Sequence, residues 1–110
     1  MGIAKSGIQT GLNYRKIEIM PRILIAESIA PEGIELLKTQ ANVDAYKGIS
    51  YEMLVQTIGQ YDGLVVRSET KVTAEVIQEA TSLQVIGRAG IGVDNIDLEA
   101  ATSKSDIFFF

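Results

Sequence analysis

Short apolar stretches alternate along the chain with segments of helical character, at roughly twenty-residue intervals, and this alternation is the strongest constraint on the fold. The apolar stretches are rich in Ile, Val and Leu, which is typical of strands that are covered on both faces. They occupy residues 22–26, 43–46, 63–66, 83–86 and 107–110. Strands of this kind, joined by helices of about ten residues, form a parallel sheet with crossover connections.

The segments between the predicted strands carry recognisable helix ends. Pro31 stands where it can open the first helix at its N1 position. The second helix is capped by Ser50 and ends at Gly59, which we expect to adopt the left-handed conformation of a C′ residue. Thr73 caps the third helix, and a fourth begins near Asp97. The sequence therefore predicts an open α/β sheet with helical crossovers.

Right-handed crossovers leave two common strand orders for such a sheet. Five short units favour the flavodoxin-like order 2-1-3-4-5, and half of a Rossmann sheet is the alternative. The chain has 110 residues, of which 46% are hydrophobic and 22% charged, so there is room for one domain with a modest core.

The charge and the missing residue types exclude several functions. A net charge of -4 argues against non-specific binding to nucleic acid or to anionic membranes. No apolar run approaches the roughly 20 residues of a membrane-spanning helix, so we expect a soluble, cytoplasmic protein. Cys and His are both absent, which excludes disulfides, thiolate nucleophiles, imidazole bases and the common Cys and His metal sites. No two acids form a convincing metal or acid/base pair, and no metal site is predicted.

Candidate binding residues follow the predicted strands at one edge of the sheet, where ligands of open α/β sheets bind. Arg67, Ser68 and Lys71 follow the third strand, and Arg88 comes directly after the fourth. Because these two strands are expected to be neighbours, the two guanidinium groups could converge on one anion. The alternative is that each arginine is structural and pairs with a nearby acid, the candidates being Glu27, Glu69 and Asp94.

The glycines of residues 87–97 suggest a dinucleotide-binding loop, but the pattern fails the test for one. Asn95 stands where the third glycine is required, and the loop follows the fourth strand rather than the first. Gly90 and Gly92 are better explained as positions where the backbone passes close to a ligand, and Asp94 and Asn95 as turn residues leading into the last helix.

Three segments together resemble one known family. They read ILIAESIAPEGIELL (residues 23–37), VVRSETKVTAEVI (residues 65–77) and LQVIGRAGIGVDNIDLEAAT (residues 83–102). In this order they strongly resemble the D-3-phosphoglycerate dehydrogenases of the D-2-hydroxyacid dehydrogenase superfamily. The resemblance implies an NAD-dependent oxidation of 3-phospho-D-glycerate to 3-phosphohydroxypyruvate, in L-serine biosynthesis, by an enzyme that is typically a homo-oligomer.

The resemblance also assigns expected roles. Arg67, Ser68 and Arg88 would face the anionic groups of the substrate, with Lys71 a weaker candidate. The loop of residues 90–97 would reach the cleft between domains, and the expected NAD contacts are Ile91, Gly90 and Gly92. Glu69 departs from the small residue that relatives usually carry, so its side chain should point away from the anion or pair with a cation.

The same resemblance predicts how the chain is organised. Residues 1–19 are interpreted as a disordered or artefactual extension, and residues 20–110 as the N-terminal part of a substrate-binding domain. The family's catalytic Arg, Glu and His, and its dinucleotide loop, belong to a cofactor domain that these residues do not include. No catalytic residue is therefore assigned, and the chain alone is predicted to be inactive. The alternative is a stand-alone anion-binding or interaction module without catalysis.

Overall fold

One parallel sheet organises the chain, and its strand order is β2-β1-β3-β4-β5. The computed structural model describes residues 20–89, 94–104 and 107–109. Its strands are β1 (Arg22–Ile25), β2 (Asn42–Ala45), β3 (Gly63–Val66), β4 (Val85–Arg88) and β5 (Phe108–Phe109). Every neighbouring pair of strands is parallel, so the flavodoxin-like order that the sequence predicts is confirmed.

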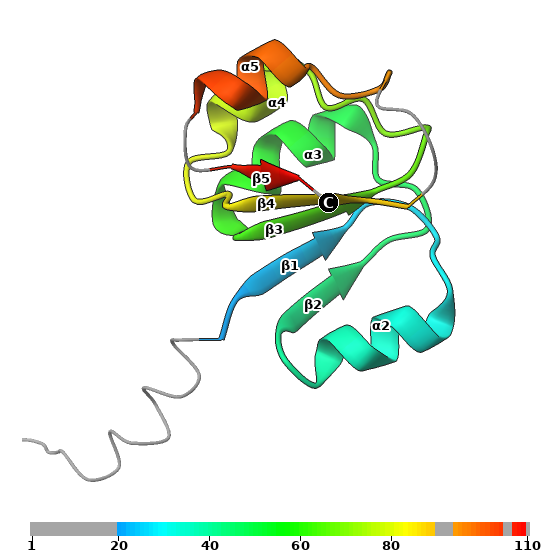
Figure 1. Cartoon of the computed structure of the whole chain (residues 1–110). Coiled ribbons are helices and arrows are strands. Elements are labelled where there is room, and N and C mark those ends of the chain that lie inside the picture. The colour runs from blue at the N-terminus through cyan, green and yellow to red at the C-terminus, as the bar shows by residue number, and fades with distance from the viewer. Residues whose placement is uncertain (1–19, 90–93, 105–106, 110) are drawn as a thin grey trace, which may run out of the picture.

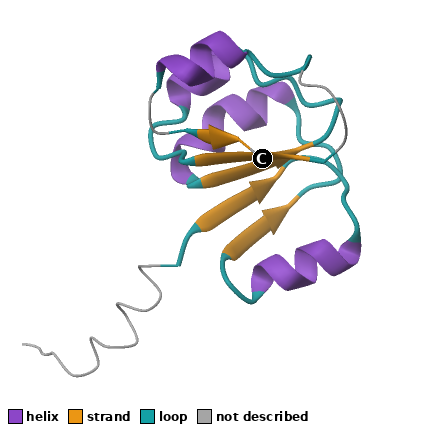
Figure 2. Ribbon diagram, viewed as in Figure 1, coloured by secondary structure: helices purple, strands orange, loops and turns teal. Residues whose placement is uncertain are grey.

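Helices cover the sheet in two unequal layers. They are α2 (Pro31–Lys38), α3 (Tyr51–Thr57), α4 (Ala74–Glu79) and α5 (Leu98–Ser103), with a 3-10 turn, η1 (Ile58–Gln60), directly after α3. Helix α2 lies on one face of the sheet, next to β2, whereas α3, α4 and α5 lie together on the other face (Figure 1). Figure 2 shows the strands as a single layer between these helices. Among the described residues, none of the helices has both the length and the apolar character needed to cross a membrane.

The predicted helix starts are found where the sequence places them. Pro31 is the first residue of α2. The side chains of Ser50, Thr73 and Asp97 cap α3, α4 and α5, each accepting a hydrogen bond from a backbone N–H in the first turn, at 3.1, 3.3 and 3.0 Å. Each cap satisfies one of the N–H groups that a helix leaves without an intrahelical partner.

The predicted role of Gly59 is wrong. This residue lies inside η1, and its φ angle is outside the left-handed region. A Cβ atom at this position would stand 3.0 Å from the carbonyl oxygen of Glu79, at the end of α4. A close approach between η1 and α4 therefore explains the glycine, and no positive φ angle is required.

The hydrophobic core lies between the sheet and the α3–α5 layer. Side chains alternate between the two faces of a strand, and those directed at this layer include Leu24, Leu64, Val66 and Ile86, which are at most 1% exposed. Helices α3, α4 and α5 each bury at least one residue against them, whereas α2 buries none.

Strand β4 starts and ends two residues later than the sequence predicts. The apolar run that signals it begins at Leu83, which is buried in the core but precedes the strand. Pairing with β3 then carries β4 through Gly87 and Arg88, whose Cα partners are Val65 and Val66. Arg88 is consequently the last residue of a strand and not, as predicted, part of the loop after it.

Candidate functional site

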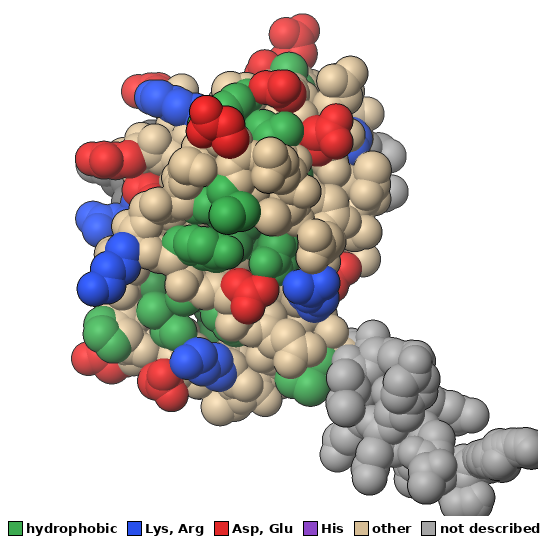
Figure 3. Space-filling view, turned by 180° about the vertical axis from the view of Figure 1, so that it is seen from behind, with side chains coloured by type: hydrophobic (Ala, Val, Ile, Leu, Met, Phe, Trp, Pro, Cys, Tyr) green, Lys and Arg blue, Asp and Glu red, His purple; other side chains and the backbone are tan. Residues whose placement is uncertain are grey.

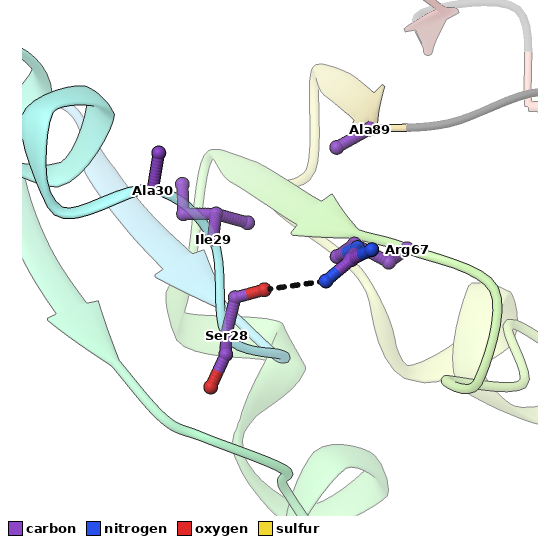
Figure 4. Close-up of a pocket in the computed structure, with 5 residues that line it drawn as sticks. All are labelled: Ser28, Ile29, Ala30, Arg67 and Ala89. Carbon is purple, nitrogen blue, oxygen red and sulfur yellow. Dashed lines mark hydrogen bonds between the residues drawn. The ribbon is translucent and has the colours of Figure 1, made fainter.

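A pocket opens at the carboxyl edge of the sheet, between the end of β1 and the end of β3. Its lining comes from the β1–α2 loop, from the start of the β3–α4 loop and from the residue after β4, namely Ser28, Ile29, Ala30, Arg67 and Ala89 (Figure 4). The pocket volume is about 490 Å3. Because β1 and β3 are neighbours while β2 lies on the far side of β1, the strand order reverses at this point. Ligands of open α/β sheets bind at such a reversal.

Arg67 supplies the charged side chain of this pocket. It directly follows β3, its side chain is exposed, and its Nη1 donates to the carbonyl oxygen of Ser28 at 3.3 Å (Figure 4). A guanidinium carries five N–H donors, so this long hydrogen bond leaves most of them available. Ser68 is exposed next to Arg67 but does not line the pocket.

Arg88 is held apart from this pocket. Its Cα partner in β3 is Val66, whose side chain belongs to the core on the α3–α5 face, and paired residues of neighbouring strands direct their side chains to the same face. The half-buried Arg88 donates from Nε to Oδ1 of Asn95 at 3.1 Å. Its Nη1 is buried without a hydrogen-bond partner among the described residues.

Arg67 lies one residue beyond the position that pairs with Arg88, and the pocket is lined by Arg67 and Ala89 but not by Arg88. The convergence of the two guanidinium groups on one anion therefore stays a prediction. The alternative, that each arginine pairs with a nearby acid, is wrong for the described residues. Among the described residues, the ion pairs within 4.0 Å are Arg22–Asp44 and Lys38–Glu35, and neither involves Arg67 or Arg88.

Glu27, which the sequence suggests only as an ion-pair partner for an arginine, binds backbone N–H groups instead. It follows β1, it is only 8% exposed, and its carboxylate faces the β3–α4 loop. There it accepts backbone N–H groups from Arg67 at 2.7 Å, from Thr70 at 2.9 Å and from Glu69 at 3.2 Å. Burial raises the pKa of Glu27, but hydrogen bonds from the Thr70 hydroxyl and from these amides outweigh burial and hold the pKa below its ordinary value of 4.5.

Asn95 holds the same loop from the opposite side. Its side-chain Nδ2 donates to the carbonyl oxygens of Arg67 at 2.6 Å and Thr70 at 2.7 Å, and the residue is 6% exposed. The turn that the sequence predicts at Asn95 is present, and the chain after it pairs with the loop through a parallel bridge between Val72 and Ile96. Only the turn-forming tendency of Asn was visible in the sequence; the long-range contacts were not.

The remaining predicted site residues either lie away from the Arg67 pocket or fall outside the residues that the structure describes. Lys71 is exposed and lines two other cavities, of about 280 and 330 Å3, rather than the Arg67 pocket. The predicted NAD contacts Gly90, Ile91 and Gly92 lie outside the described residues. Within the described part of the chain, no group of acids is arranged to hold a metal ion. Figure 3 shows acidic and basic side chains interspersed over one face of the molecule, without a continuous basic surface.

The sequence of the chain matches known proteins over most of its length. The family model described as D-isomer specific 2-hydroxyacid dehydrogenase, catalytic domain, matches residues 23–107. D-3-phosphoglycerate dehydrogenase of Synechocystis sp. is 46% identical over 85 residues, which are 77% of this chain and 15% of that protein. The enzyme of the same name from Archaeoglobus fulgidus is 49% identical over 84 residues, 76% of this chain and 16% of that protein. The chain thus spans less than a fifth of the length of these relatives.

Solved structures share the fold. The PH0520 protein of Pyrococcus horikoshii superposes with a TM-score of 0.77 at 35% identity, covering 84% of this chain and 28% of that one. An NAD+-bound 3-phosphoglycerate dehydrogenase of Entamoeba histolytica superposes with a TM-score of 0.70 at 27% identity, covering 82% of this chain and 32% of that one. The resemblance drawn from three sequence segments is confirmed. From the family match over residues 23–107 and the shared fold, the chain belongs to the D-isomer specific 2-hydroxyacid dehydrogenase family.

Proposed function

We propose that this chain contributes substrate recognition to an NAD-dependent D-3-phosphoglycerate dehydrogenase, which oxidises 3-phospho-D-glycerate to 3-phosphohydroxypyruvate in L-serine biosynthesis. The observation that supports this most directly is the pocket at the reversal of strand order, where the exposed Arg67 is the charged lining residue. The proposed substrate carries a carboxylate and a phosphate, and a guanidinium matches the oxygens of both. The named relatives at 46% and 49% identity support the choice of substrate.

In this proposal Arg67 is the principal anion contact, because its side chain is exposed at the pocket and keeps free donors. Ser68 is an adjacent hydroxyl donor. Arg88 is a further candidate, since its Nη1 has no hydrogen-bond partner among the described residues. Lys71 ranks below these, since it lines other cavities.

The proposed contribution is binding and orientation of the substrate, while hydride transfer needs groups beyond this chain. The sequence contains no His, so no imidazole is available here as a base near neutral pH. The described residues also do not fit NAD: the β1–α2 loop lacks glycine, and the buried carboxylate of Glu27 in that loop would repel a pyrophosphate. We propose that Gly90, Ile91 and Gly92 approach NAD held by another domain, and that the whole enzyme is a homo-oligomer.

An NMR titration of the 15N-labelled chain with 3-phosphoglycerate tests the role of Arg67. One anion contact supports a Kd on the order of 1 mM, which corresponds to about 4 kcal/mol. Arg67→Gln removes the charge-assisted hydrogen bonds and should weaken binding about tenfold or more. Arg22→Gln is the matched control, because Arg22 starts β1 at the opposite edge of the sheet, and it should leave the Kd unchanged.

The outcomes separate the possibilities. Equal affinities of the Arg67→Gln and Arg22→Gln variants would contradict the assigned pocket. Sub-micromolar affinity for 3-phosphoglycerate would favour a stand-alone anion-binding module, which needs no second domain to complete its site. The purified chain mixed with NAD and 3-phosphoglycerate should form no NADH, measured as absorbance at about 340 nm, and turnover free of contaminating enzyme would refute the expected division of roles.

A further inference from the structure

Two buried polar side chains, from distant parts of the sequence, hold one loop between them. Glu27 follows β1, Asn95 precedes α5, and both contact the backbone of the β3–α4 loop at Arg67 and Thr70. They are 8% and 6% exposed. Burial of a carboxylate and of an amide is costly unless each is hydrogen-bonded, so these contacts stabilise one arrangement of the loop over others.

The contacts divide the backbone groups of the loop by type. The N–H groups of Arg67 and Thr70 donate to the Glu27 carboxylate, and the C=O groups of the same two residues accept from Nδ2 of Asn95. Successive N–H groups that turn inward form a concave site for an anion. Here that site is filled by a carboxylate of the chain itself, so the amides of Arg67 and Thr70 are already engaged.

We propose that Glu27 and Asn95 are positioning residues that preset the β3–α4 loop, so that an incoming anion is recognised by the Arg67 side chain and not by the loop amides. The inference rests on the proposed function for the ligand, but the positioning itself is a property of the chain alone. Asn95 adds a link to the neighbouring strand, because its Oδ1 accepts from Nε of Arg88. The two arginines that the sequence singled out thus share one supporting side chain.

Amide hydrogen exchange of the 110-residue chain, read by NMR, tests the role of Glu27. Glu27→Gln removes the charge and leaves one acceptor oxygen, which cannot serve both sides of the former carboxylate. We expect the hydrogen exchange of the Glu69 amide to become about tenfold faster or more. The exchange of the Arg67 and Thr70 amides should also become faster. Glu69→Gln is the matched control: the same substitution, in the same loop, at an exposed side chain.

A second variant tests the contacts that Asn95 makes with the same loop. Asn95→Asp replaces the donor group by an oxygen that faces two carbonyl oxygens, so it should also accelerate exchange of the Arg67 and Thr70 amides. Asp94→Asn is the control: it makes the reverse substitution at an exposed neighbouring residue and should leave the exchange of the Arg67 and Thr70 amides unchanged. In all variants the amides of Leu24 and Leu64 report whether the central strands remain folded. Unchanged loop exchange in a folded Glu27→Gln or Asn95→Asp variant would overturn the inference.

The unmodified chain provides a test that does not depend on the folding of any variant. On acidification, the amide shifts of Arg67, Glu69 and Thr70 should move with one midpoint, equal to that of the Glu27 carboxyl carbon. The titratable groups that line the cavity beside Glu27 are Lys47, Tyr51, Glu69 and Lys71, so the carboxyl carbon of Glu69 is followed separately. If the shifts of the loop amides change with the midpoint of the Glu69 carboxyl group, or show no common midpoint, the contact between Glu27 and the loop amides is refuted.

Inorganic phosphate and 3-phosphoglycerate are the ligand probes. Glu27→Gln should weaken binding of both about tenfold relative to Glu69→Gln, because the loop is no longer preset. Tighter phosphate binding by Glu27→Gln would mean that the carboxylate competes with the ligand for the loop amides, which would overturn the inference. If the unmodified chain binds neither probe while the exchange results hold, the proposed function fails and the positioning role stands.

Discussion

Removal of the Tyr61 hydroxyl group tests the polar contacts at the amino edge of the sheet. Tyr61 is 5% exposed, and its hydroxyl donates to Oδ2 of Asp44 at 2.6 Å. The guanidinium carbon of Arg22 lies 5.0 Å from the centre of its ring. Tyr61→Phe keeps the ring and this cation–π contact but removes the hydrogen bond.

The expected cost follows from the partner. A hydrogen bond to a charged group contributes roughly 1.5–3 kcal/mol, but the side chain of Asp44 is 52% exposed and regains water when the hydroxyl is removed. We therefore expect Tyr61→Phe to lower the free energy of unfolding by about 1 kcal/mol at neutral pH.

The same contact has a signature in alkali. Burial and the hydrogen bond to Asp44 raise the pKa of Tyr61 to about 12, above the ordinary value of 10.0. A pKa that is higher in the folded state means that the stabilisation is fully present below pH 10 and is lost as the pH rises from 10 towards 12. About two pH units correspond to at most roughly 3 kcal/mol, and the exposure of Asp44 reduces this figure.

Urea unfolding followed by circular dichroism measures both effects. Tyr46→Phe is the matched control, because Tyr46 is 38% exposed and its hydroxyl makes no hydrogen bond to a described residue. The difference in stability between the unmodified chain and Tyr61→Phe should shrink between pH 10 and pH 12. Equal stabilities of the Tyr61→Phe and Tyr46→Phe variants at pH 7, or a difference that grows in alkali, would refute the reasoning.

Three further results are expected from urea unfolding. Leu64→Ala should lower the free energy of unfolding by about 2–5 kcal/mol, because Leu64 is 1% exposed in the central strand β3. Leu36 is 70% exposed, so Leu36→Ala should change the free energy of unfolding by less than about 0.5 kcal/mol. Gly33→Ala should stabilise α2 by about 0.5–1 kcal/mol, since the new Cβ meets its nearest atom at 3.8 Å, but Gly59→Ala should destabilise the fold because of the carbonyl oxygen at 3.0 Å. The lowered pKa of Glu27 means that its contribution is present above pH 4.5 and is lost as the pH falls further, so Glu27→Gln should lose stability less steeply in acid than the unmodified chain.

The regular elements were predictable because their signals are local. The alternation of apolar runs and capped helices indicates a parallel sheet, and the side chains of Ser50, Thr73 and Asp97 do cap their helices. The errors occur where tertiary contacts decide. Gly59 is explained by a neighbouring carbonyl oxygen rather than by its own φ angle, and Leu83 is buried without belonging to a strand.

The candidate site was predictable only in part, for the same reason. The edge of the sheet and the position of Arg67 follow from the topology, which the hydrophobic pattern determines. The face to which Arg88 points depends on the pairing of β3 with β4, and a one-residue slip in that pairing would reverse it. The contacts of Glu27 with residues 67–70 join positions that are 40 to 43 residues apart, and no local pattern reports such contacts.

Helix α2 buries no residue, although it forms the whole crossover between β1 and β2. Separation of this helix from the sheet would uncover Ile25, which is fully buried but lies outside the core between the sheet and α3–α5, together with the half-buried Ile34 and Leu37. Separation of α4 would uncover the buried Val76 and Ile77 and the core behind them. The α2 layer should therefore be the less stable of the two and open locally more often than the α3–α5 layer. The β1–α2 loop supplies one wall of the pocket. Local opening of α2 would therefore move this wall, while the wall that contains Arg67 stays in place.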